Sequence, residues 1–333
     1  MKKLASAALA FIFVTMFALN AEAAPKEIKF AYDLGVNSPQ DIAAKVAFSN
    51  FIHEKSGGRF KVTCFPQGTV GGPDTVYQSV LMGDIQIYVS SPGNFTPFVP
   101  EVAVLDLPYL FHSAEDATTF LQTKSYQLFL DNFARKARGI TPAGLMIPEY
   151  PFRIFASGKP IKKLDDLKGL KARSTASKIH VAFLNAVGAN ATPISGAEVP
   201  SALQQGVVDC ADGELVSAYY VRWFDMVNNI YAPDAIVNPN MTIMSEMWFK
   251  SLSEEDQAMI REGIDLYHNT VRKLVAEESV KIREELAARG VNYVAITDSD
   301  KDRAIEMTKK VWNDLPEETK KLAEAIKNDM YGN

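Results

Sequence analysis

An arginine lies where the sequence predicts a ligand-binding edge. In the stretch 165–209, the segment 170–173 has the pattern of a short β-strand, and a helical segment follows it and ends near Gly188. Ligands of α/β domains bind outside the carboxyl ends of strands, and Arg173 lies at such an end. A guanidinium stays charged and offers a planar fork of N–H donors that fits a carboxylate. The first prediction is a site for an organic anion.

The residues that enzymes commonly use form no recognisable motif. The sequence contains no G-x-S-x-G, H-E-x-x-H or G-x-x-x-x-G-K-[ST] tract. The four histidines (His53, His112, His180 and His268) are scattered, and each is interpreted as structural. These patterns favour a protein that binds its ligand without converting it, with no cofactor and no metal. A secreted enzyme is the alternative from another class.

The first 23 residues are typical of a cleaved export signal. Two lysines precede an apolar run (residues 4–19), and Ala21-Glu22-Ala23 is a small-x-small cleavage site. The run is short for a membrane span of about 20 residues, so an uncleaved anchor is the less favoured alternative. Export predicts a periplasmic protein, where a disulfide is allowed. We nevertheless expect Cys64 and Cys210 to be free, because a bridge between two lobes would obstruct their motion.

Length and charge limit the kind of protein further. Removing 23 residues leaves 333 − 23 = 310, enough for two domains of about 150 residues. The leader carries two lysines and one glutamate, so the net charge of −5 becomes −5 − 2 + 1 = −6. No basic run indicates nucleic-acid binding. We predict a first lobe from 24–150 plus about 239–278, and a second from 151–238 plus about 279–333.

Strands and helices alternate along the chain. The elements expected in the first lobe are strands at 27–32, 60–65 and 85–89 with helices at 39–54 and 74–82. In the second lobe, a strand near 152–156 and the arginine strand precede two helices, which end at Gly188 and Gly206 with a Thr192-Pro193 turn between them. This order predicts an α/β fold of two lobes with mostly parallel sheets and right-handed crossovers.

A long helix is expected near the carboxyl end. No helix-breaking residue interrupts the chain between Ser253, a capping residue, and Gly290. A helix of about 35 residues spans roughly 50 Å, which exceeds one small domain. We expect it to pack on both lobes. A coiled-coil dimer is the alternative, but sustained apolar heptads are absent, and a monomer is predicted.

Several tracts resemble a known family of receptors. The segments 166–173 (DLKGLKAR), 188–194 (GANATPI) and 198–209 (EVPSALQQGVVD) are similar, in order and spacing, to motifs of the solute-binding subunits of tripartite ATP-independent periplasmic (TRAP) transporters, in the dicarboxylate-binding, DctP-like branch. Further similar tracts are 55–59, 65–66, 107–111 and 249–252. The resemblance covers nearly the whole mature chain.

The resemblance assigns roles to two arginines, and at three other positions this chain lacks the residue that the family commonly has. In the family, the residue at Arg173 clamps the ligand carboxylate and an arginine at Arg153 assists it. Family members commonly have an aromatic residue at the position of Gly196, a ligand-binding asparagine at that of Gly213 and a histidine at that of Ala235. Because all three side chains are missing here, we expect a roomier pocket and a ligand held unlike sialic acid or a simple C4-dicarboxylate.

Other residues are expected to contact the ligand. Asp33, Ser90 and Ser91 match family positions that contact its polar end. Among the residues near the arginines, Asp212 and Glu214 could accept hydrogen bonds from hydroxyl or amino groups, and Asn238 and Asn240 could bind from the rim. Candidate walls are Tyr32, Asn94, Tyr219 and Trp223.

The resemblance implies a periplasmic receptor that closes on a small organic acid and delivers it to the small and large membrane subunits of a transporter driven by an ion gradient. The same fold serving as the input of a signalling system is the alternative that the sequence leaves open.

Overall fold

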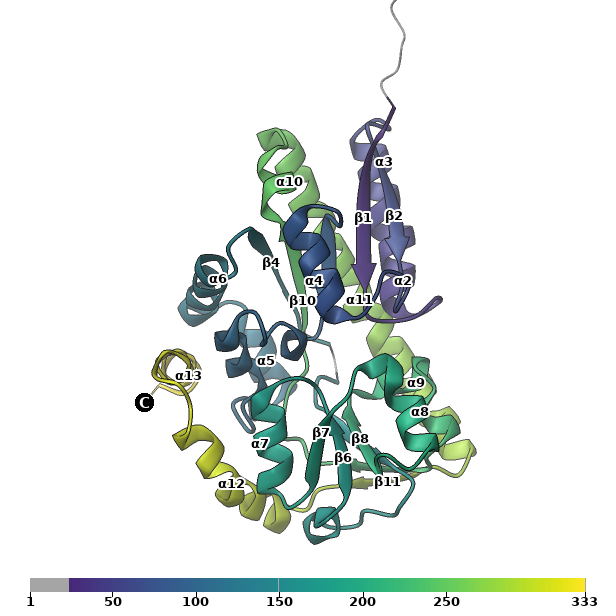
Figure 1. Ribbon diagram of the computed structural model, residues 1–333, viewed down its shortest axis with the longest axis vertical. Helices are drawn as coiled ribbons and strands as arrows, with labels where there is room; N and C mark the ends of the chain where they lie inside the picture. The colour runs from purple at the N-terminus through teal and green to yellow at the C-terminus, as the bar shows by residue number, and fades with distance from the viewer. Residues whose placement is uncertain (1–23, 149, 333) are drawn as a thin grey trace, which may run out of the picture.

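The computed structural model describes residues 24–148 and 150–332, so the predicted export signal lies outside the described residues. Two lobes, each built around one β-sheet, lie end to end (Figure 1). The five-stranded sheet of the first lobe has the order β2-β1-β3-β10-β4. Its strands are β1 (Lys26–Tyr32), β2 (Phe60–Phe65), β3 (Ile87–Ser90), β4 (Ile140–Met146) and β10 (Asn240–Ser245).

The second sheet has six strands in the order β11-β9-β5-β8-β6-β7. They are β5 (Ile154–Ser157), β6 (Lys171–Ser174), β7 (Asn190–Pro193), β8 (Cys210–Gly213), β9 (Asn229–Ala232) and β11 (Asn292–Ala295). Both cysteines are free thiols, one in each sheet. The Thr192-Pro193 segment, expected as a turn, is part of the edge strand β7, which pairs parallel with β6. A proline is tolerated there because an edge strand has one unpaired side.

Both sheets are mixed, and their antiparallel strands lie next to two of the crossings between the lobes. After β4 the chain enters the second lobe as β5, which runs antiparallel to β8 and β9. After β9 it returns as β10, antiparallel to β3 and β4. The two crossing segments also bind each other, through the Asn238 amide to Pro151 and the Arg153 amide to Ile236. The two crossings therefore run side by side, joined by backbone hydrogen bonds.

Helices cover the faces of both sheets. Those of the first lobe are α2 (Pro39–Ile42), a π-helical stretch (Ala43–Phe48), α3 (Ser49–Lys55), α4 (Pro73–Met82), α5 (Ala114–Phe120), α6 (Lys124–Lys136) and α10 (Glu246–Lys250). Those of the second are α7 (Lys178–Ala186), α8 (Val199–Gln204) and α9 (Leu215–Tyr220). Short 3-10 segments are Pro92–Asn94, Pro100–Asp106, Leu164–Leu167, Gly196–Glu198 and Trp223–Asp225.

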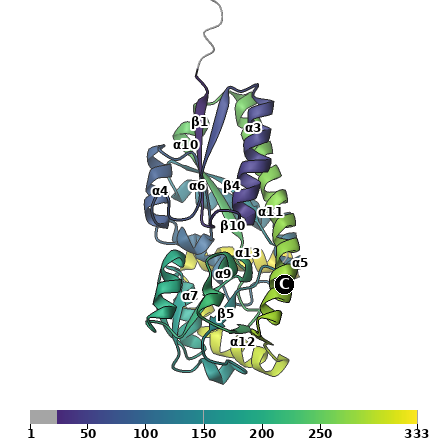
Figure 2. The same cartoon turned by 90° about the vertical axis from the view of Figure 1, so that its right-hand side faces the viewer.

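The long helix α11 (Glu254–Ala288) confirms the prediction of an uninterrupted helix. Ser253 caps it by accepting a hydrogen bond from the Asp256 amide. It runs along both lobes (Figure 2), and its buried side chains share one apolar core with Phe48 of the first lobe and Trp223 of the second. The helix therefore forms a common backing for the two sheets.

The last two helices bridge the lobes as well. α12 (Asp298–Asn313) packs on α7 of the second lobe, whereas α13 (Glu317–Tyr331) packs on α5 and α6 of the first. Leu322 and Ile326 of α13 are buried in the first-lobe core. This differs from the expected division, in which the whole segment 279–333 belonged to the second lobe. An apolar helix face does not by itself say which lobe it will cover.

A buried histidine in the first lobe makes a pH dependence of stability testable. His268 of α11 lies 2.7 Å, through Nε2, from the Thr242 hydroxyl, and burial together with the charge of Arg272 lowers its pKa from 6.5 to about 4. The unfolded chain binds this proton more readily, so the contribution is fully present above pH 6.5 and is lost as the pH falls to about 4.

We expect the wild type to lose up to about 3 kcal/mol more unfolding free energy than His268→Gln between pH 7 and 4. Urea unfolding of both proteins across this range is the measurement. His53→Gln, at an exposed histidine of α3, is the matched control and should follow the wild type. Parallel curves for the wild type and His268→Gln would show that the pKa of His268 is the same in the folded and unfolded states, and would contradict the lowered pKa.

Candidate functional site

The site lies where the polar edges of the two sheets face each other. In the first lobe, Asp33 follows β1 and Ser91 follows β3. In the second, Arg173 lies on β6 and Glu214 follows β8. Because β5 runs antiparallel to β8, its first residue pairs with the last residue of β8, and Arg153, directly before β5, lies at the same edge. The mixed topology thus brings both arginines together.

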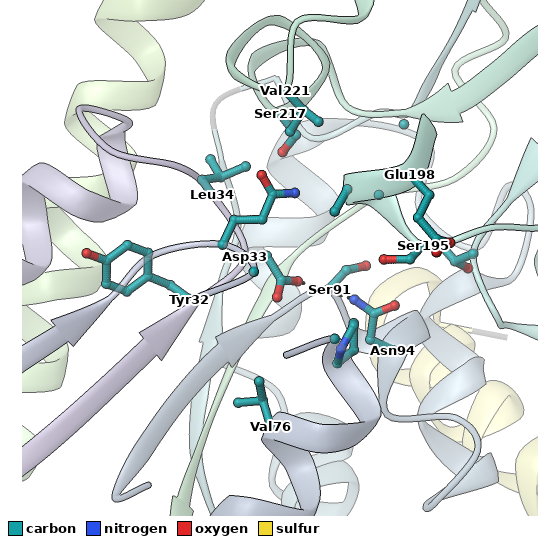
Figure 3. Close-up of a pocket in the computed structure, with 18 of the residues that line it drawn as sticks. Tyr32, Asp33, Leu34, Val76, Ser91, Asn94, Ser195, Glu198, Ser217 and Val221 are labelled. Atoms are coloured by element: carbon teal, nitrogen blue, oxygen red, sulfur yellow. Dashed lines mark hydrogen bonds between the residues drawn. The ribbon is translucent and has the colours of Figure 1, made fainter. Parts of the chain in front are cut away.

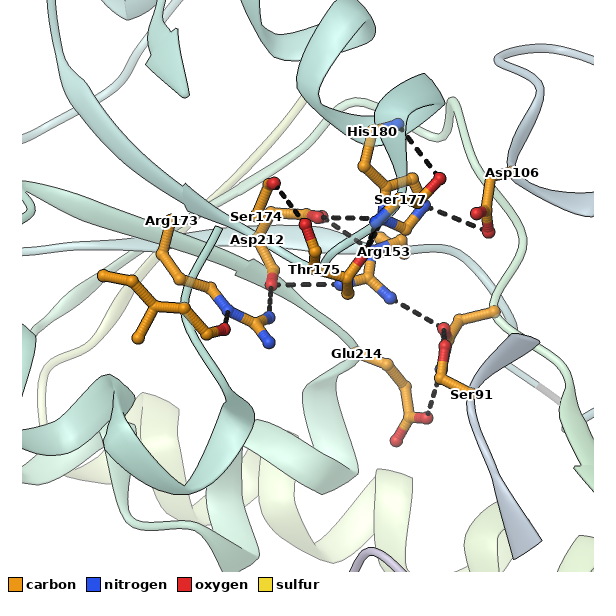
Figure 4. Close-up of polar contacts among 12 residues, drawn as sticks. Ser91, Asp106, Arg153, Arg173, Ser174, Thr175, Ser177, His180, Asp212 and Glu214 are labelled. Atoms are coloured by element: carbon orange, nitrogen blue, oxygen red, sulfur yellow. Dashed lines mark hydrogen bonds and ion pairs between the residues drawn. The ribbon is translucent and has the colours of Figure 1, made fainter. Parts of the chain in front are cut away.

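Each side-chain nitrogen of Arg153 donates one hydrogen bond within the protein (Figure 4). Its Nε donates to Asp212 Oδ1 at 2.8 Å, its Nη2 to the Asp212 carbonyl at 3.0 Å, and its Nη1 to Asn238 Oδ1 at 2.7 Å. Burial by itself raises the pKa of Asp212, but attraction to Arg153 and His180 lowers it below its ordinary value. Arg153 and Asp212 therefore form a buried ion pair that shapes the site, and Asp212 is not the free acceptor we expected.

Arg173 is 5% exposed and keeps one nitrogen uncommitted. Its Nε donates to the Ile194 carbonyl at 2.8 Å and its Nη1 to the Asp212 carbonyl at 2.7 Å, whereas Nη2 donates to none of the described residues. Burial, followed by repulsion from Arg153, lowers the Arg173 pKa to about 10 against the attraction of Asp212. Arg153 pairs with the Asp212 carboxylate, whereas Arg173 contacts only the Asp212 carbonyl, so an anion here would supply Arg173 with a direct counter-charge.

A buried histidine joins this cluster to the first lobe. His180 of α7 lies, through Nε2, 3.2 Å from Oδ1 of Asp106, the last residue of a first-lobe 3-10 segment. Its Nδ1 lies 2.7 Å from the Thr175 hydroxyl and 3.8 Å from Asp212 Oδ2. The side chain therefore links the lobes beside the arginine pair, which agrees with the structural role expected for it.

Glu214 connects the second lobe to the crossing. Its Oε1 caps α9 by accepting hydrogen bonds from the amide and hydroxyl of Ser217 at 2.9 and 2.8 Å. Its Oε2 accepts only a 3.3 Å bond from Asn238 Nδ2, so it retains capacity for a ligand donor. Asn238 Oδ1 in turn accepts from the Ser91 hydroxyl of the first lobe at 2.8 Å.

Asp33 forms the opposite wall (Figure 3). It accepts hydrogen bonds from the hydroxyls of Tyr88 and Ser90 and from Asn94 Nδ2. Burial raises the pKa of Asp33, and the hydrogen bonds from Ser90, Tyr88, the Ser91 amide and Asn94 oppose that rise. The donors hold the carboxylate in place at the cavity wall, and Asp33 Oδ1, with one partner, can accept another hydrogen bond.

These side chains surround an interlobe cavity of about 690 Å³. Its size is that of a site for a small organic molecule. The charged side chains that line it are two cations and four acids: Arg153, Arg173, Asp33, Asp74, Glu198 and Glu214. Asn238 accepts from Arg153 Nη1 and donates to Glu214 Oε2, so Glu214 lies at the arginine end of the cavity, whereas Asp33 lies on the first-lobe wall.

The predicted site residues divide into two groups. The cavity lining includes Arg173, Arg153, Asp33, Ser91, Gly196, Gly213, Glu214 and Asn238, together with the expected walls Tyr32, Asn94 and Trp223. Outside the lining are Asp212, held by Arg153; Ser90, held by Asp33; Asn240, bonded to Gln40; and Tyr219, bonded to Glu285. Lining residues missed by the sequence include Thr175, Ser195 and Ser217, which lie outside the quoted motifs, and Glu198, the first residue of the 198–209 motif.

The expected enlargement of the pocket is wrong at two of the three positions. A Cβ at Gly213 would lie 2.4 Å from the Trp223 ring, so the indole fills that space. Ala235 is buried in the second-lobe core. Only Gly196 borders open room, where a Cβ would meet a single neighbour, Arg173 Nη2, at 3.9 Å.

Residues 30–319 match the sequence model of DctP, the bacterial extracellular solute-binding proteins of family 7. The chain belongs to this family. Among its curated relatives is the 2,3-diketo-L-gulonate-binding periplasmic protein YiaO of Escherichia coli K12, 28% identical over 84% of this chain and 83% of the relative. The C4-dicarboxylate-binding periplasmic protein DctP of Shewanella loihica is 26% identical over 87% and 82%.

Solved structures agree with this assignment. A TRAP periplasmic solute-binding protein from Shewanella oneidensis with bound succinate superposes with a TM-score of 0.85 at 25% identity, covering 91% of this chain and 98% of that chain. One from Bordetella bronchiseptica, with density attributed to pantoate, gives 0.83 at 26%, covering 91% and 99%. These matches confirm the family resemblance and the two-lobed α/β fold predicted from the sequence.

As a member of this family, the protein is a periplasmic solute-binding protein, which confirms the prediction from the sequence. None of the helices within 24–148 and 150–332 combines the length and apolar character needed to cross a membrane.

Proposed function

We propose that this DctP-family receptor binds a hydroxylated organic acid with a single carboxylate and delivers it to the membrane subunits of a TRAP transporter. The observation that carries the proposal is the uncommitted Nη2 of Arg173 in a buried, positively charged end of the cavity. A carboxylate there would gain a charge-assisted hydrogen bond and would relieve the repulsion between the two guanidiniums.

The other walls favour hydroxyl groups on the ligand. Glu214 Oε2 and Asp33 Oδ1 each have capacity to accept, and Glu198 and Asp74 lie on the rim. A second carboxylate would meet these acids, whereas hydroxyl groups would donate to them. A ligand without hydroxyl groups would cover these carboxylates and leave them without hydrogen-bond donors, which would weaken its binding.

The names of the relatives are compatible with this ligand class. Diketo-gulonate and pantoate, named for two of them, are hydroxy acids with one carboxylate. Succinate and C4-dicarboxylates, named for others, have two. We place the present chain with the first group because of the acids that line its cavity. We further propose that the ligand leaves unaltered, as expected of a receptor.

A matched panel of ligands tests the proposal. We expect an aldonate such as gulonate to raise the melting temperature, because a ligand that binds only the folded state stabilises it. Two control compounds should bind at least tenfold more weakly than the aldonate in calorimetric titrations. One is the corresponding polyol, which lacks the carboxylate, and the other is hexanoate, which lacks the hydroxyls. Succinate should also bind more weakly than the hydroxy acid. Tighter binding of succinate or hexanoate than of every hydroxylated acid would refute the proposed ligand class.

A further inference from the structure

Gly213 has no backbone reason to be glycine. Its φ is not among the positive values found in the described residues, so an alanine would fit the main chain there. The obstacle is the indole of Trp223: an added Cβ would lie 2.4 Å from Cη2 and 2.7 Å from Cζ3. Such distances are far below contact distance, so the ring and a side chain at 213 exclude each other.

An unusual backbone conformation and a buried core fix the position of this indole. Trp223 follows Arg222, whose φ of 65° is in the left-handed region that non-glycine residues rarely adopt. The Trp223 side chain is 3% exposed, belongs to the core shared with α11, and lines the cavity. A local turn and a buried core therefore hold the ring against β8.

The ring also faces the ligand-binding cation. The Cζ atom of Arg173 lies 5.7 Å from the Trp223 ring centroid, within the range of a cation–π interaction. The hydrogen bonds donated by Nε and Nη1 of Arg173 fix two edges of its guanidinium group, and the indole lies beside that group. Arg173 is thus held on several sides while Nη2 stays available.

We propose that Trp223 is the positioning residue of Arg173, and that Gly213 is required because it admits the indole. In this receptor an aromatic ring occupies the place of a side chain that could have bound the ligand itself. The orientation of the clamp then depends on Trp223, and the carboxylate relies on Arg173. This inference rests on the proposed function of Arg173.

A double-mutant cycle tests it, with the acid from the ligand panel that stabilises the wild type most. Gly213→Ala should displace the indole and weaken binding at least tenfold. Trp223→Leu should weaken binding to a similar extent. Because the added methyl has nothing to displace once the indole is gone, the double variant should bind as the Trp223→Leu protein does.

Gly263→Ala is the matched control for crowding alone. A Cβ at Gly263 would lie 3.0 Å from Phe48 in the core, away from the cavity, so this variant should lose stability and keep the wild-type affinity. The inference would be overturned if Gly213→Ala weakened binding as much in the Trp223→Leu protein as in the wild type. It would also be overturned if the Gly213→Ala protein bound the acid with wild-type affinity. Either result leaves the proposed function intact, because the wild type would still bind the acid.

A fluorescence measurement applies even if a Gly213 variant does not fold. The chain has three tryptophans, so Trp248→Phe with Trp312→Phe leaves Trp223 as the single indole. Its emission should change with the acid and saturate at the calorimetric Kd. An emission that stays constant while calorimetry reports binding would contradict a ring placed beside the occupied clamp.

Discussion

Replacing Arg173 with lysine should weaken binding of the acid by about 2–3 kcal/mol, or roughly 30- to 150-fold in Kd. Lysine keeps the charge but loses the planar fork: its three N–H donors radiate from a single nitrogen, which cannot occupy at once the separate positions from which Nε and Nη1 of Arg173 reach Ile194 and Asp212 and Nη2 faces the ligand. Calorimetric titration gives the affinity. The thermal transition of the unliganded variant should stay close to that of the wild type, because the lysine still places one cation beside Asp212.

Arg59→Lys is the matched control for Arg173→Lys. Arg59 forms a bidentate pair with Asp256 at 3.1 and 2.7 Å outside the cavity lining, so its replacement tests the loss of a fork away from the ligand. Its affinity for the acid should equal that of the wild type. An Arg173→Lys protein that binds with undiminished affinity would remove Arg173 from the clamp.

Replacing Arg153 with glutamine should act on stability, with an expected loss of about 3–5 kcal/mol in the free energy of unfolding. The Arg153 and Asp212 side chains are each 5% exposed and joined at 2.8 Å, so the variant leaves a buried carboxylate without its partner. Urea unfolding without ligand measures the loss. The double variant Arg153→Gln with Asp212→Asn should recover part of it, because the carboxylate that Arg153→Gln leaves without its partner is then neutral.

The comparison with an exposed pair checks this interpretation. Arg59→Gln breaks a pair whose arginine side chain is 54% exposed, and it should cost much less stability than Arg153→Gln. A double variant whose loss relative to the wild type equals the sum of the Arg153→Gln and Asp212→Asn losses would show that the buried pair is not the cause.

The framework of the fold could be predicted because it depends on local patterns. The strand at Phe60–Phe65 and the helix Glu254–Ala288 were expected almost to the residue, since alternation, capping and the absence of breakers are visible in the sequence. The edge strand Asn190–Pro193 was missed because its exposed, polar residues resemble a turn. The packing of α13 on the first lobe depends on contacts between distant segments.

The site was predicted as a set of residues but not as a network. Arg173 could be found because its residue type, its strand and the family motif all point to a carboxylate. That Arg153 is occupied by Asp212 could not be predicted, because the pair forms only when β5 inserts antiparallel beside β8. A side chain at position 213 and the indole of Trp223 cannot occupy the same space. The only hint of this in the sequence is a glycine where the family has a larger residue, followed by a tryptophan ten residues later.

A structure of the complex with a hydroxylated acid tests the central claim most directly. A carboxylate oxygen of the ligand should lie about 2.7–3.2 Å from Nη2 of Arg173, with ligand hydroxyls directed at Asp33 or Glu214 and Arg153 still bound to Asp212. A carboxylate bound elsewhere, with Nη2 of Arg173 free of ligand contact, would contradict the account.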